Sequence, residues 1–377
     1  MEELVVTMGP NLDHNSREFK ENARKICGKR LGGAWMTVPV ENLHIKKLTG
    51  GMSNLLFHCY LDENHAPLKE EPKQIIMRFY LTPVEAHLLE SHIFTILSER
   101  KLGPKLHGLL TNGRLEEFLP SVTLTRLEMI SPSIAKQIAK KLTKIHQQKD
   151  MPLEINPNIC DTIEGWLSLL RSSSASGSEF YVENADGKCV GINCEHLQQE
   201  VEHLKDRIRR TQSVTAFCHN DLQPGNFLRC QTNKLTLNAN PLRNTDATLM
   251  IIDYEYASYN YSFDFANHFV EYSIDYVKNG YKMLPDEFLS DNQMLCFMYN
   301  YEKELRPDVS EEDLRENARS MIRETLPFVP VSHLFWGIWS LKQWQLQWQP
   351  QSPIKFDYYG YGCARLTLYN KSKGMMW

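Results

Sequence analysis

Runs of apolar residues with strand and helix spacing divide the chain into a β-rich first part and a helical second part. The first part opens with a predicted short helix at 17–33. Strand-like runs follow, and a helix from Pro83 to about Arg100 interrupts them, because apolar residues recur there at helical spacing. The strands are predicted at 42–48, 53–61, 74–80, 105–110 and 114–119. This pattern predicts a small antiparallel sheet with one major helix.

Helical spacing predominates beyond about residue 120. Helices are predicted at 133–148, 161–170 and 194–210, and the aromatic-rich chain from Phe263 onward is also predicted to be helical. A Ser-rich loop at 172–178 and a polar stretch at 231–246 separate these elements. The predicted fold class is therefore α+β with two lobes. We expect an N-terminal extension at 1–39, a β-lobe that binds ATP at 40–120, and a helical C-terminal lobe at 121–377.

Composition narrows the class of protein. The 377 residues are 42% hydrophobic and 23% charged, which is typical of a globular protein, and the net charge of −4 gives no global attraction to nucleic acid or anionic membrane. The first residues lack the pattern of a signal peptide, and no run approaches the roughly 18 apolar residues of a membrane span. Nine cysteines without a CxxC pair indicate reduced thiols. These observations predict a cytoplasmic protein with no nucleic-acid partner and no stable membrane insertion.

The strongest chemical signal lies in two short segments, 218–226 and 251–255. Asp221 is followed five residues later by Asn226, and an apolar run downstream ends in Asp253. Phosphoryl transfer from ATP uses these groups: one carboxylate accepts the proton of a hydroxyl, while an amide oxygen and a second carboxylate bind magnesium. We therefore predict Asp221 as the catalytic base and Asn226 and Asp253 as Mg²⁺ ligands.

Alternative interpretations of these segments remain open. Such residues are also ordinary turn formers, so a structural turn is possible for the first segment. His219 is expected to brace the loop by hydrogen bonding rather than to react. Glu255 either shares metal binding with Asp253 or forms a structural ion pair.

The β-rich part offers candidate groups for a nucleotide. A Gly-rich turn at 50–54 lets backbone N–H groups approach phosphates. Arg78, on the third predicted strand, supplies positive charge for the phosphates, and Glu90 on the next helix is a candidate partner for it. The backbone at 117–119 would connect the lobes and hydrogen-bond adenine. The predicted nucleotide-binding residues are Gly50, Gly51, Met52, Ser53, Asn54, Arg78, Glu117, Phe118, Leu119 and Asp253. A plain hairpin turn and a surface arginine are the alternatives.

Aromatic residues gather near the catalytic segment and in the last hundred residues. Taken singly, each is more often core than ligand site, but together with a carboxylate they would form a box that attracts a quaternary ammonium by cation–π interaction. A cationic substrate is therefore predicted. The candidate residues are Tyr256, Glu271, Tyr276, Trp336, Trp339, Phe356, Tyr358 and Tyr361.

Several of these segments resemble the choline/ethanolamine kinase family. The similar segments are H-N-D-L-Q-P-G-N at 219–226, D-Y-E-Y-A-S-Y-N-Y at 253–261 and F-D-F-A-N-H-F-V-E at 263–271, together with 50–54, 102–106 and 332–340. The resemblance spans roughly residues 40–370. It implies a protein-kinase-like fold, ATP and Mg²⁺ as cosubstrates, and phosphorylation of choline to phosphocholine, the first step of the CDP-choline route to phosphatidylcholine. It also implies a cytosolic homodimer.

The resemblance assigns the same roles to the candidate residues and adds one. Asp221 would be the base and Asn226 and Asp253 the metal ligands, while Gln223 would lie near the substrate. Gln223 stands where protein kinases have lysine, and Arg78 also replaces a lysine, so both residues fit the small-molecule branch of kinases. The eight aromatic and acidic candidates above would form the choline pocket.

Three alternative functions are distinguishable. An ethanolamine kinase would bind a primary ammonium, which needs hydrogen-bond acceptors more than a full aromatic cage, although one enzyme can use both amines. An aminoglycoside kinase would present an acidic, open substrate lobe. A catalytically inactive kinase-like binding module would be expected to lack some of Asp221, Asn226 and Asp253, all of which are present.

Overall fold

The computed structural model describes residues 13–48, 54–65, 67–80, 87–152, 159–172, 177–210, 215–230, 248–278, 280–346 and 356–375. The chain divides into two compact units, Met1–Ser121 and Val122–Trp377. Three sequence predictions fall wholly or largely outside the described residues: the Gly-rich turn that precedes Asn54, the Ser-rich loop, and the polar stretch at 231–246.

The first unit is built on a five-stranded antiparallel sheet in the order β1-β2-β3-β5-β4. Two-residue periodicity along these strands sends alternate side chains to opposite faces. The strands are β1 (Leu43–Leu48), β2 (Asn54–Leu61), β3 (Gln74–Tyr80), β4 (Leu106–Leu110) and β5 (Gly113–Glu117).

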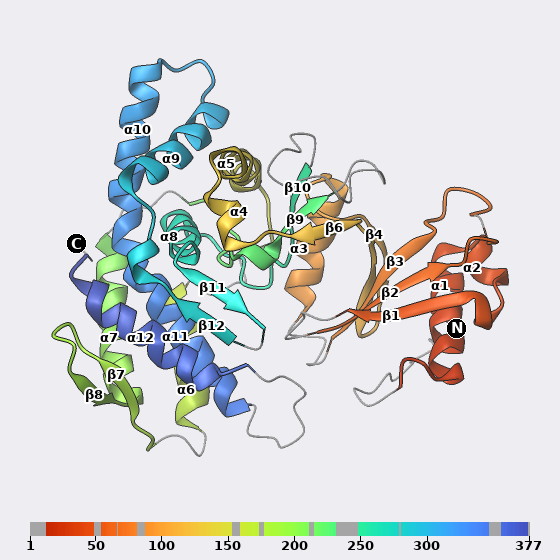
Figure 1. Cartoon of the computed structure of the whole chain (residues 1–377), viewed down its shortest axis with the longest axis horizontal. Coiled ribbons are helices and arrows are strands. Elements are labelled where there is room, and N and C mark those ends of the chain that lie inside the picture. Colours follow the sequence, from red (N-terminus) through yellow and green to blue (C-terminus); the bar gives the residue numbers. More distant parts are fainter. Residues whose placement is uncertain are drawn as a thin grey trace. The chain divides into compact units, whose positions relative to one another are not determined.

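Helices cover both faces of this sheet (Figure 1). The first helix, α1 (Arg17–Leu31), starts at the side-chain cap of Ser16, and its Phe19 and Cys27 share a core with Phe57 and Met77 of the sheet. The short helix α2 (Ala34–Thr37) adds Trp35 to this core. The segment predicted as an extension is thus an integral part of the first unit's core. The neighbouring strand residues point to the opposite face, where α3 (Leu88–Glu99) lies.

The second unit is mainly helical. A three-stranded sheet in the order β10-β9-β6 and two hairpins, β7–β8 and β11–β12, accompany its helices. The long helices α11 and α12 lie side by side (Figure 1). The helices are α4 (Arg126–Ile130), α5 (Pro132–His146), α6 (Ile159–Arg171), α7 (Cys194–Arg210), α8 (Tyr261–Glu271), α9 (Asp291–Leu305), α10 (Glu311–Thr325), α11 (Val329–Leu346) and α12 (Tyr358–Ser372). The strands are β6 (Ser121–Thr123), β7 (Phe180–Glu183), β8 (Cys189–Ile192), β9 (Phe227–Cys230), β10 (Thr248–Ile251), β11 (Ile274–Val277) and β12 (Gly280–Met283).

The predicted α+β architecture, an antiparallel sheet followed by a helical part, is confirmed. The prediction of unbroken helices after Phe263 was wrong, because the hairpin β11–β12 follows α8 and carries Tyr276. A turn signal was present in the sequence, since the dipeptide Asn-Gly at 279–280 favours a tight hairpin. The hairpin β7–β8 was missed in the same way, although Asp186 and Gly187 form the same kind of signal.

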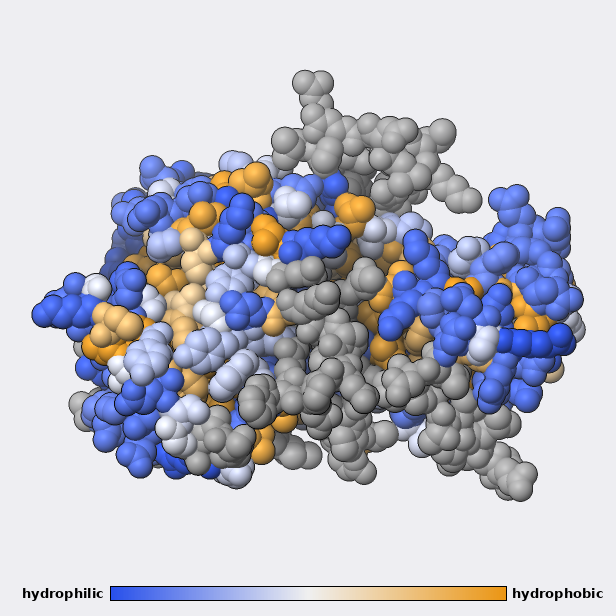
Figure 2. All heavy atoms as spheres, turned by 60° about the horizontal axis from the view of Figure 1, so that its bottom comes forward, coloured by the Kyte–Doolittle hydropathy of each residue, from blue (hydrophilic) through white to orange (hydrophobic). Residues whose placement is uncertain are grey.

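Hydrophilic residues predominate on the face shown in Figure 2, and hydrophobic residues appear in patches among them. Many apolar side chains of the second unit gather in a large core cluster, to which α6, α7, α8, α11 and α12 contribute. Within the described part of the chain, none of the helices has the length and hydrophobicity that a membrane crossing needs.

Candidate active site

The loop that carries Asp221 is held between two β pairings of the second unit. Its start is fixed by Cys218, which exchanges backbone hydrogen bonds of 2.9 and 3.1 Å with Ser258. Its end runs through a short 3-10 turn, Pro224–Asn226, into β9. The carbonyl of Asn226 accepts a hydrogen bond of 3.0 Å from the N–H of Ile252, the residue before Asp253. The loop and the start of the second predicted segment therefore lie next to each other.

Helix α8 supports this loop by hydrogen bonds from the loop backbone to its side chains. Asp264 accepts the backbone N–H groups of His219 at 3.0 Å and Asn220 at 2.6 Å, and Asn267 accepts that of Leu222 at 2.8 Å. Both acceptors are fully buried. Sequence reasoning assigned them no role, but a signal existed: Asp264, Asn267 and Glu271 are spaced i, i+3 and i+7, so they share one face of a helix. One face of α8 thus serves both the loop and the predicted substrate carboxylate.

His219 connects the two predicted catalytic segments. Its Nε2 lies 2.9 Å from the carbonyl oxygen of Ile252, and its Nδ1 lies 3.1 Å from the backbone N of Asp221. This pattern requires a neutral ring that donates from Nε2 and accepts at Nδ1. Burial lowers the pKa of His219, which favours the same neutral state. The imidazole is therefore committed to bracing the loop, as the sequence predicted.

Asn220, next to the predicted base, and Asp253, a predicted metal ligand, have unusual backbone conformations. Asn220 has φ 69° and Asp253 has φ 72°. Residues other than glycine rarely adopt this left-handed region. Those that do cluster at functional sites, where the surrounding structure holds them in place. The hydrogen bonds from Asn220 to Asp264, to the carbonyl of Tyr256 at 2.7 Å and to Ser258 at 2.6 Å provide that support.

Asp221 is half-buried and lies beside the other two predicted catalytic side chains. The Nδ2 of Asn226 donates to the Oδ2 of Asp221 at 2.8 Å, and the Nε2 of Gln223 approaches the same oxygen at 3.5 Å. Loss of solvent around the carboxyl, together with the negative charges of Glu271 and Asp253, raises the pKa of Asp221 to about 8. A carboxyl with this pKa can both take up and release a proton near neutral pH.

The residues present fit a hard divalent cation. Because the Nδ2 of Asn226 is turned to Asp221, its amide Oδ1 is the atom available to a cation, and Asp253 adds carboxylate oxygens. Oxygen donors of this kind are the ligands that Mg²⁺ prefers. A second group, His146, Cys218 and Asp264, brings three potential ligand atoms within 4.8 Å of one another. We assign that group to loop support, because Asp264 already accepts a 2.9 Å contact from His146 besides its two backbone bonds.

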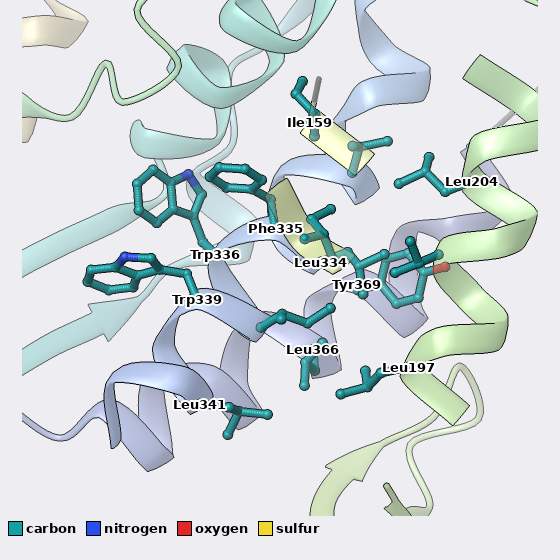
Figure 3. Close-up of a cluster of buried hydrophobic side chains, with 14 of the residues drawn as sticks. Ile159, Leu197, Leu204, Leu334, Phe335, Trp336, Trp339, Leu341, Leu366 and Tyr369 are labelled. Carbon is teal, nitrogen blue, oxygen red and sulfur yellow. The ribbon is translucent and has the colours of Figure 1, made fainter. Parts of the chain in front are cut away.

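All eight predicted substrate residues lie in one connected cluster of the second unit. Tyr256 packs edge-on against Trp336 with ring centroids 5.1 Å apart, and its hydroxyl accepts a 2.7 Å hydrogen bond from the indole of Trp339. The chain of ring contacts continues from Trp339 to Tyr358 at 5.7 Å, and from Tyr358 through Phe356 to Tyr361 at 4.9 and 5.5 Å. In Figure 3 the two indoles project from α11 away from Leu197 and Leu204 of α7, so they lie on one side of the buried cluster to which they belong.

Glu271 closes this cluster as a buried carboxylate. Its Oε2 accepts a hydrogen bond of 2.8 Å from Tyr276, whose hydroxyl also lies 3.1 Å from that of Tyr361. Its Oε1 accepts one of 3.3 Å from Arg365. Burial raises the pKa of Glu271, while Arg365 opposes that shift. The cluster therefore has the composition predicted for a cation site, with rings and one acidic group.

The first unit contains the described part of the predicted nucleotide site. Asn54 begins β2 and is buried, and Glu117, Phe118 and Leu119 are half-buried at the end of β5 and just after it. Arg78, on β3, donates to Glu116 at 2.6 Å. Glu90, the expected partner of Arg78, accepts a 2.7 Å hydrogen bond from Arg114 of β5, and the positive charges of Arg114 and Arg78 both lower the pKa of Glu90 against the effect of burial. Arg78 and Arg114 lie opposite each other in the sheet, and Glu116 bonds to both. Glu116 and Glu90 together balance the charges of the two arginines.

Comparison with known proteins agrees with this architecture. A solved choline kinase from Cryptosporidium parvum superposes with a TM-score of 0.72 over 94% of this chain and 95% of that one, at 21% identity. The fold is thus that of the protein-kinase-like phosphotransferases. The family model described as choline/ethanolamine kinase matches residues 45–370. The chain belongs to the choline/ethanolamine kinase family, and it is therefore a kinase that acts on choline or ethanolamine.

Two curated relatives extend this finding. A protein named choline kinase A2 from Caenorhabditis elegans is 41% identical, with 100% of this chain and 91% of the relative covered. A protein named choline/ethanolamine kinase from Homo sapiens is 34% identical, with 96% of this chain and 88% of the relative covered. The names of these relatives include both amines, so they leave the preferred substrate of this chain open.

Proposed function

We propose that this chain transfers the γ-phosphoryl group of ATP to the hydroxyl of choline. The observation that carries the proposal is a direct link between loop and aromatic cluster. Asn220, next to the predicted base, bonds the carbonyl of Tyr256, and the Tyr256 hydroxyl bonds Trp339. A cation held by the rings would have its hydroxyl arm near Asp221. This link supports a proposal in which a proton acceptor and a cation site act on one substrate.

In this mechanism Asp221 accepts the proton of the choline hydroxyl. The oxygen of that hydroxyl bonds to the γ-phosphorus at the same time. The bond between that phosphorus and the β–γ bridging oxygen breaks, and ADP leaves with the released electron pair. Asn226 holds Asp221 in place through its Nδ2 and, with Asp253, would hold Mg²⁺ through oxygen atoms. Bound Mg²⁺ supplies positive charge against the phosphate oxygens. Gln223 lies beside Asp221, where it would orient the substrate hydroxyl.

We assign ATP to the residues predicted in the first unit. Arg78 would face the phosphates as a cation held by Glu116. The Gly-rich turn before Asn54 would cover the phosphates, and the backbone at 117–119 would bond the adenine. This assignment rests on the family membership and on the buried, charge-balanced setting of Arg78.

The chemistry of the cluster favours choline over ethanolamine. A primary ammonium has three N–H donors that need acceptors, whereas a trimethylammonium group has none and is attracted to ring faces. Each oxygen of Glu271 already accepts one hydrogen bond, from Arg365 and from Tyr276. Ethanolamine is the second candidate, because a carboxylate oxygen can accept more than one hydrogen bond.

Measurement of ADP release tests the proposal. Purified protein with ATP and Mg²⁺ is expected to release ADP rapidly when choline is added, less rapidly with ethanolamine, and only at background rate with neither. If neither amine stimulates release, then the chain acts by binding and the proposal fails. A rate with ethanolamine above that with choline would reverse the substrate assignment.

Assembly and location follow the family resemblance and are part of the same proposal. We propose a homodimer in the cytoplasm. Sedimentation at micromolar concentration is expected to give twice the mass of 43.9 kDa, and a single species at the monomer mass would contradict the dimer.

A further inference from the structure

Arg365 is the most deeply buried charge next to the aromatic cluster. Its side chain is fully buried on α12, and it bonds groups from two other helices. Nη1 donates to Glu271 at 3.3 Å and to the Tyr361 hydroxyl at 3.2 Å. Nη2 donates to the backbone and side-chain oxygens of Ser332 at 3.1 and 3.2 Å. One guanidinium therefore joins α12 to Glu271 on α8 and to α11, the helix that carries both indoles.

Glu271 needs a cation at this place for two reasons. It is almost fully buried, and removal of water raises its pKa toward the neutral form. It is also the last residue of α8, where the helix dipole disfavours a negative charge. The positive charge of Arg365 is the largest influence that opposes the raised pKa of Glu271. Tyr276 adds a hydrogen bond but carries no positive charge.

We propose that Arg365 is a positioning residue that sets the affinity of the aromatic cluster for the substrate cation. It keeps Glu271 ionised and oriented and holds Tyr361, one of the ring residues, so it acts through both without being a member of the cage. This inference rests on the proposed function, because it assumes that Glu271 and the rings bind the cationic end of the substrate.

A purely structural role is the competing explanation. A buried ion pair can join helices without contributing to any site, and breaking such a pair is destabilising in itself. A structural role would lower thermal stability and would not distinguish the KM of the amine from that of ATP. Under a structural role, the charge of residue 271 would affect the loss of stability but not the choline KM.

A double-mutant cycle on the full-length protein separates the two roles. The variants are Arg365→Met, Glu271→Gln and the pair together, assayed for kcat, for the KM of choline and of ATP, and for Tm. Turnover of choline by the unmodified protein is measured first. Absence of turnover would refute the proposed function, and the role of Arg365 in choline binding would fail with it. We expect Arg365→Met to raise the choline KM by roughly 10–100-fold. This is the range for outer-shell groups that orient the ligands of a metal through hydrogen bonds. The ATP KM is expected to change by less than about threefold.

In the Glu271→Gln background, Arg365→Met is expected to change the choline KM by less than about threefold, because the group through which it acts is gone. An equal effect in both backgrounds, or an equal change in both KM values, would overturn the proposal. If Arg365→Met does not fold, Arg365→Lys serves instead. It keeps the charge but cannot bond Ser332 and Glu271 together, so an intermediate rise of the choline KM is expected.

Arg126 offers a matched control. It is also a buried arginine of the second unit, and it bonds a carboxylate, Glu287 at 2.7 Å, and a backbone carbonyl, Tyr272 at 3.0 Å. Arg126→Met is expected to lower Tm while both KM values stay within about threefold of the unmodified protein. A choline KM raised as much as in Arg365→Met would show that any buried arginine has the effect, which would overturn the specific role of Arg365.

Discussion

The side-chain amide of Asn226 donates a hydrogen bond of 2.8 Å to the Oδ2 of Asp221. The same nitrogen lies 2.8 Å from the backbone carbonyl of Asp221, so it fixes both the side chain and the loop. An asparagine that is a candidate metal ligand is therefore also the group that orients the candidate base. In the proposed mechanism, metal binding and proton transfer would be coupled through this one side chain.

Asp221→Asn tests the base. The substitution keeps size and polarity but removes the proton acceptor, so turnover is expected to fall by about 10²–10⁴-fold, the usual contribution of a general base. The fold and nucleotide binding are expected to persist, measured by thermal melting and by ATP titration. Asp308→Asn, at an exposed position between α9 and α10, is the control and should leave turnover unchanged. Near-normal turnover of Asp221→Asn would remove Asp221 from the mechanism.

The same substitution has an expected pH signature in stability. The pKa of Asp221 is about 8 in the folded protein and near 4 in an unfolded chain, so the native state retains a proton that the unfolded state releases between these values. The contribution of Asp221 to the stability of the unmodified protein should therefore fall as pH rises from about 4 to 8. The Tm advantage of Asp221→Asn should grow over that range and level off above it. Allowing for partial solvent exposure, the gain at pH 8 is about 2 kcal/mol. A pH-independent difference in Tm would contradict the raised pKa.

Trp339→Ala tests the cation site. Loss of one desolvated ring face is worth about 2 kcal/mol, which corresponds to roughly a 30-fold rise in the choline KM, with little change in that for ATP. Trp344→Ala is the matched control on the same helix, because Trp344 packs against Tyr359 and Phe180 outside the eight-residue cluster. An effect of Trp339→Ala on stability alone, with both KM values unchanged, would show that the ring is core.

Arg114→Met tests the buried charge network of the first unit. Arg114 is almost fully buried and bonds Glu90 and Glu116 at 2.7 Å each, so its removal leaves two buried carboxylates without this partner. Unfolding free energy is expected to drop by about 3–5 kcal/mol, measured by denaturant melts. Arg319→Met, which breaks a surface pair with Glu316, should cost less than about 1 kcal/mol. Similar losses for the two variants would contradict the account of the network.

The sequence predicted much of this molecule because its signals were local. The strand at 74–80 coincides with β3, and the helix at 194–210 coincides with α7, since apolar spacing decides both. The order of Asp221, Asn226 and Asp253 predicted phosphoryl transfer, and membership of a kinase family agrees with that class of reaction. The structure adds that these residues lie where the ends of β9 and β10 meet.

The contacts that the sequence did not predict are long-range. Asp264 and Asn267 support the loop from more than forty residues away, and no spacing rule relates them to His219 or Leu222. Glu90 bonds Arg114, a partner that the sequence did not predict, because strand order places Arg78 and Arg114 opposite each other. Such pairings depend on the packing of α3 and α8, which local periodicity does not determine.

One competition experiment tests the central claim most directly. The full-length protein is incubated with ATP, Mg²⁺ and equal concentrations of choline and ethanolamine, and the phosphomonoesters are quantified by ³¹P NMR. Phosphocholine is expected to predominate in the unmodified protein, and Asp221→Asn is expected to form neither product above background. Phosphoethanolamine as the main product, or phosphocholine formed at a normal rate by Asp221→Asn, would contradict the account.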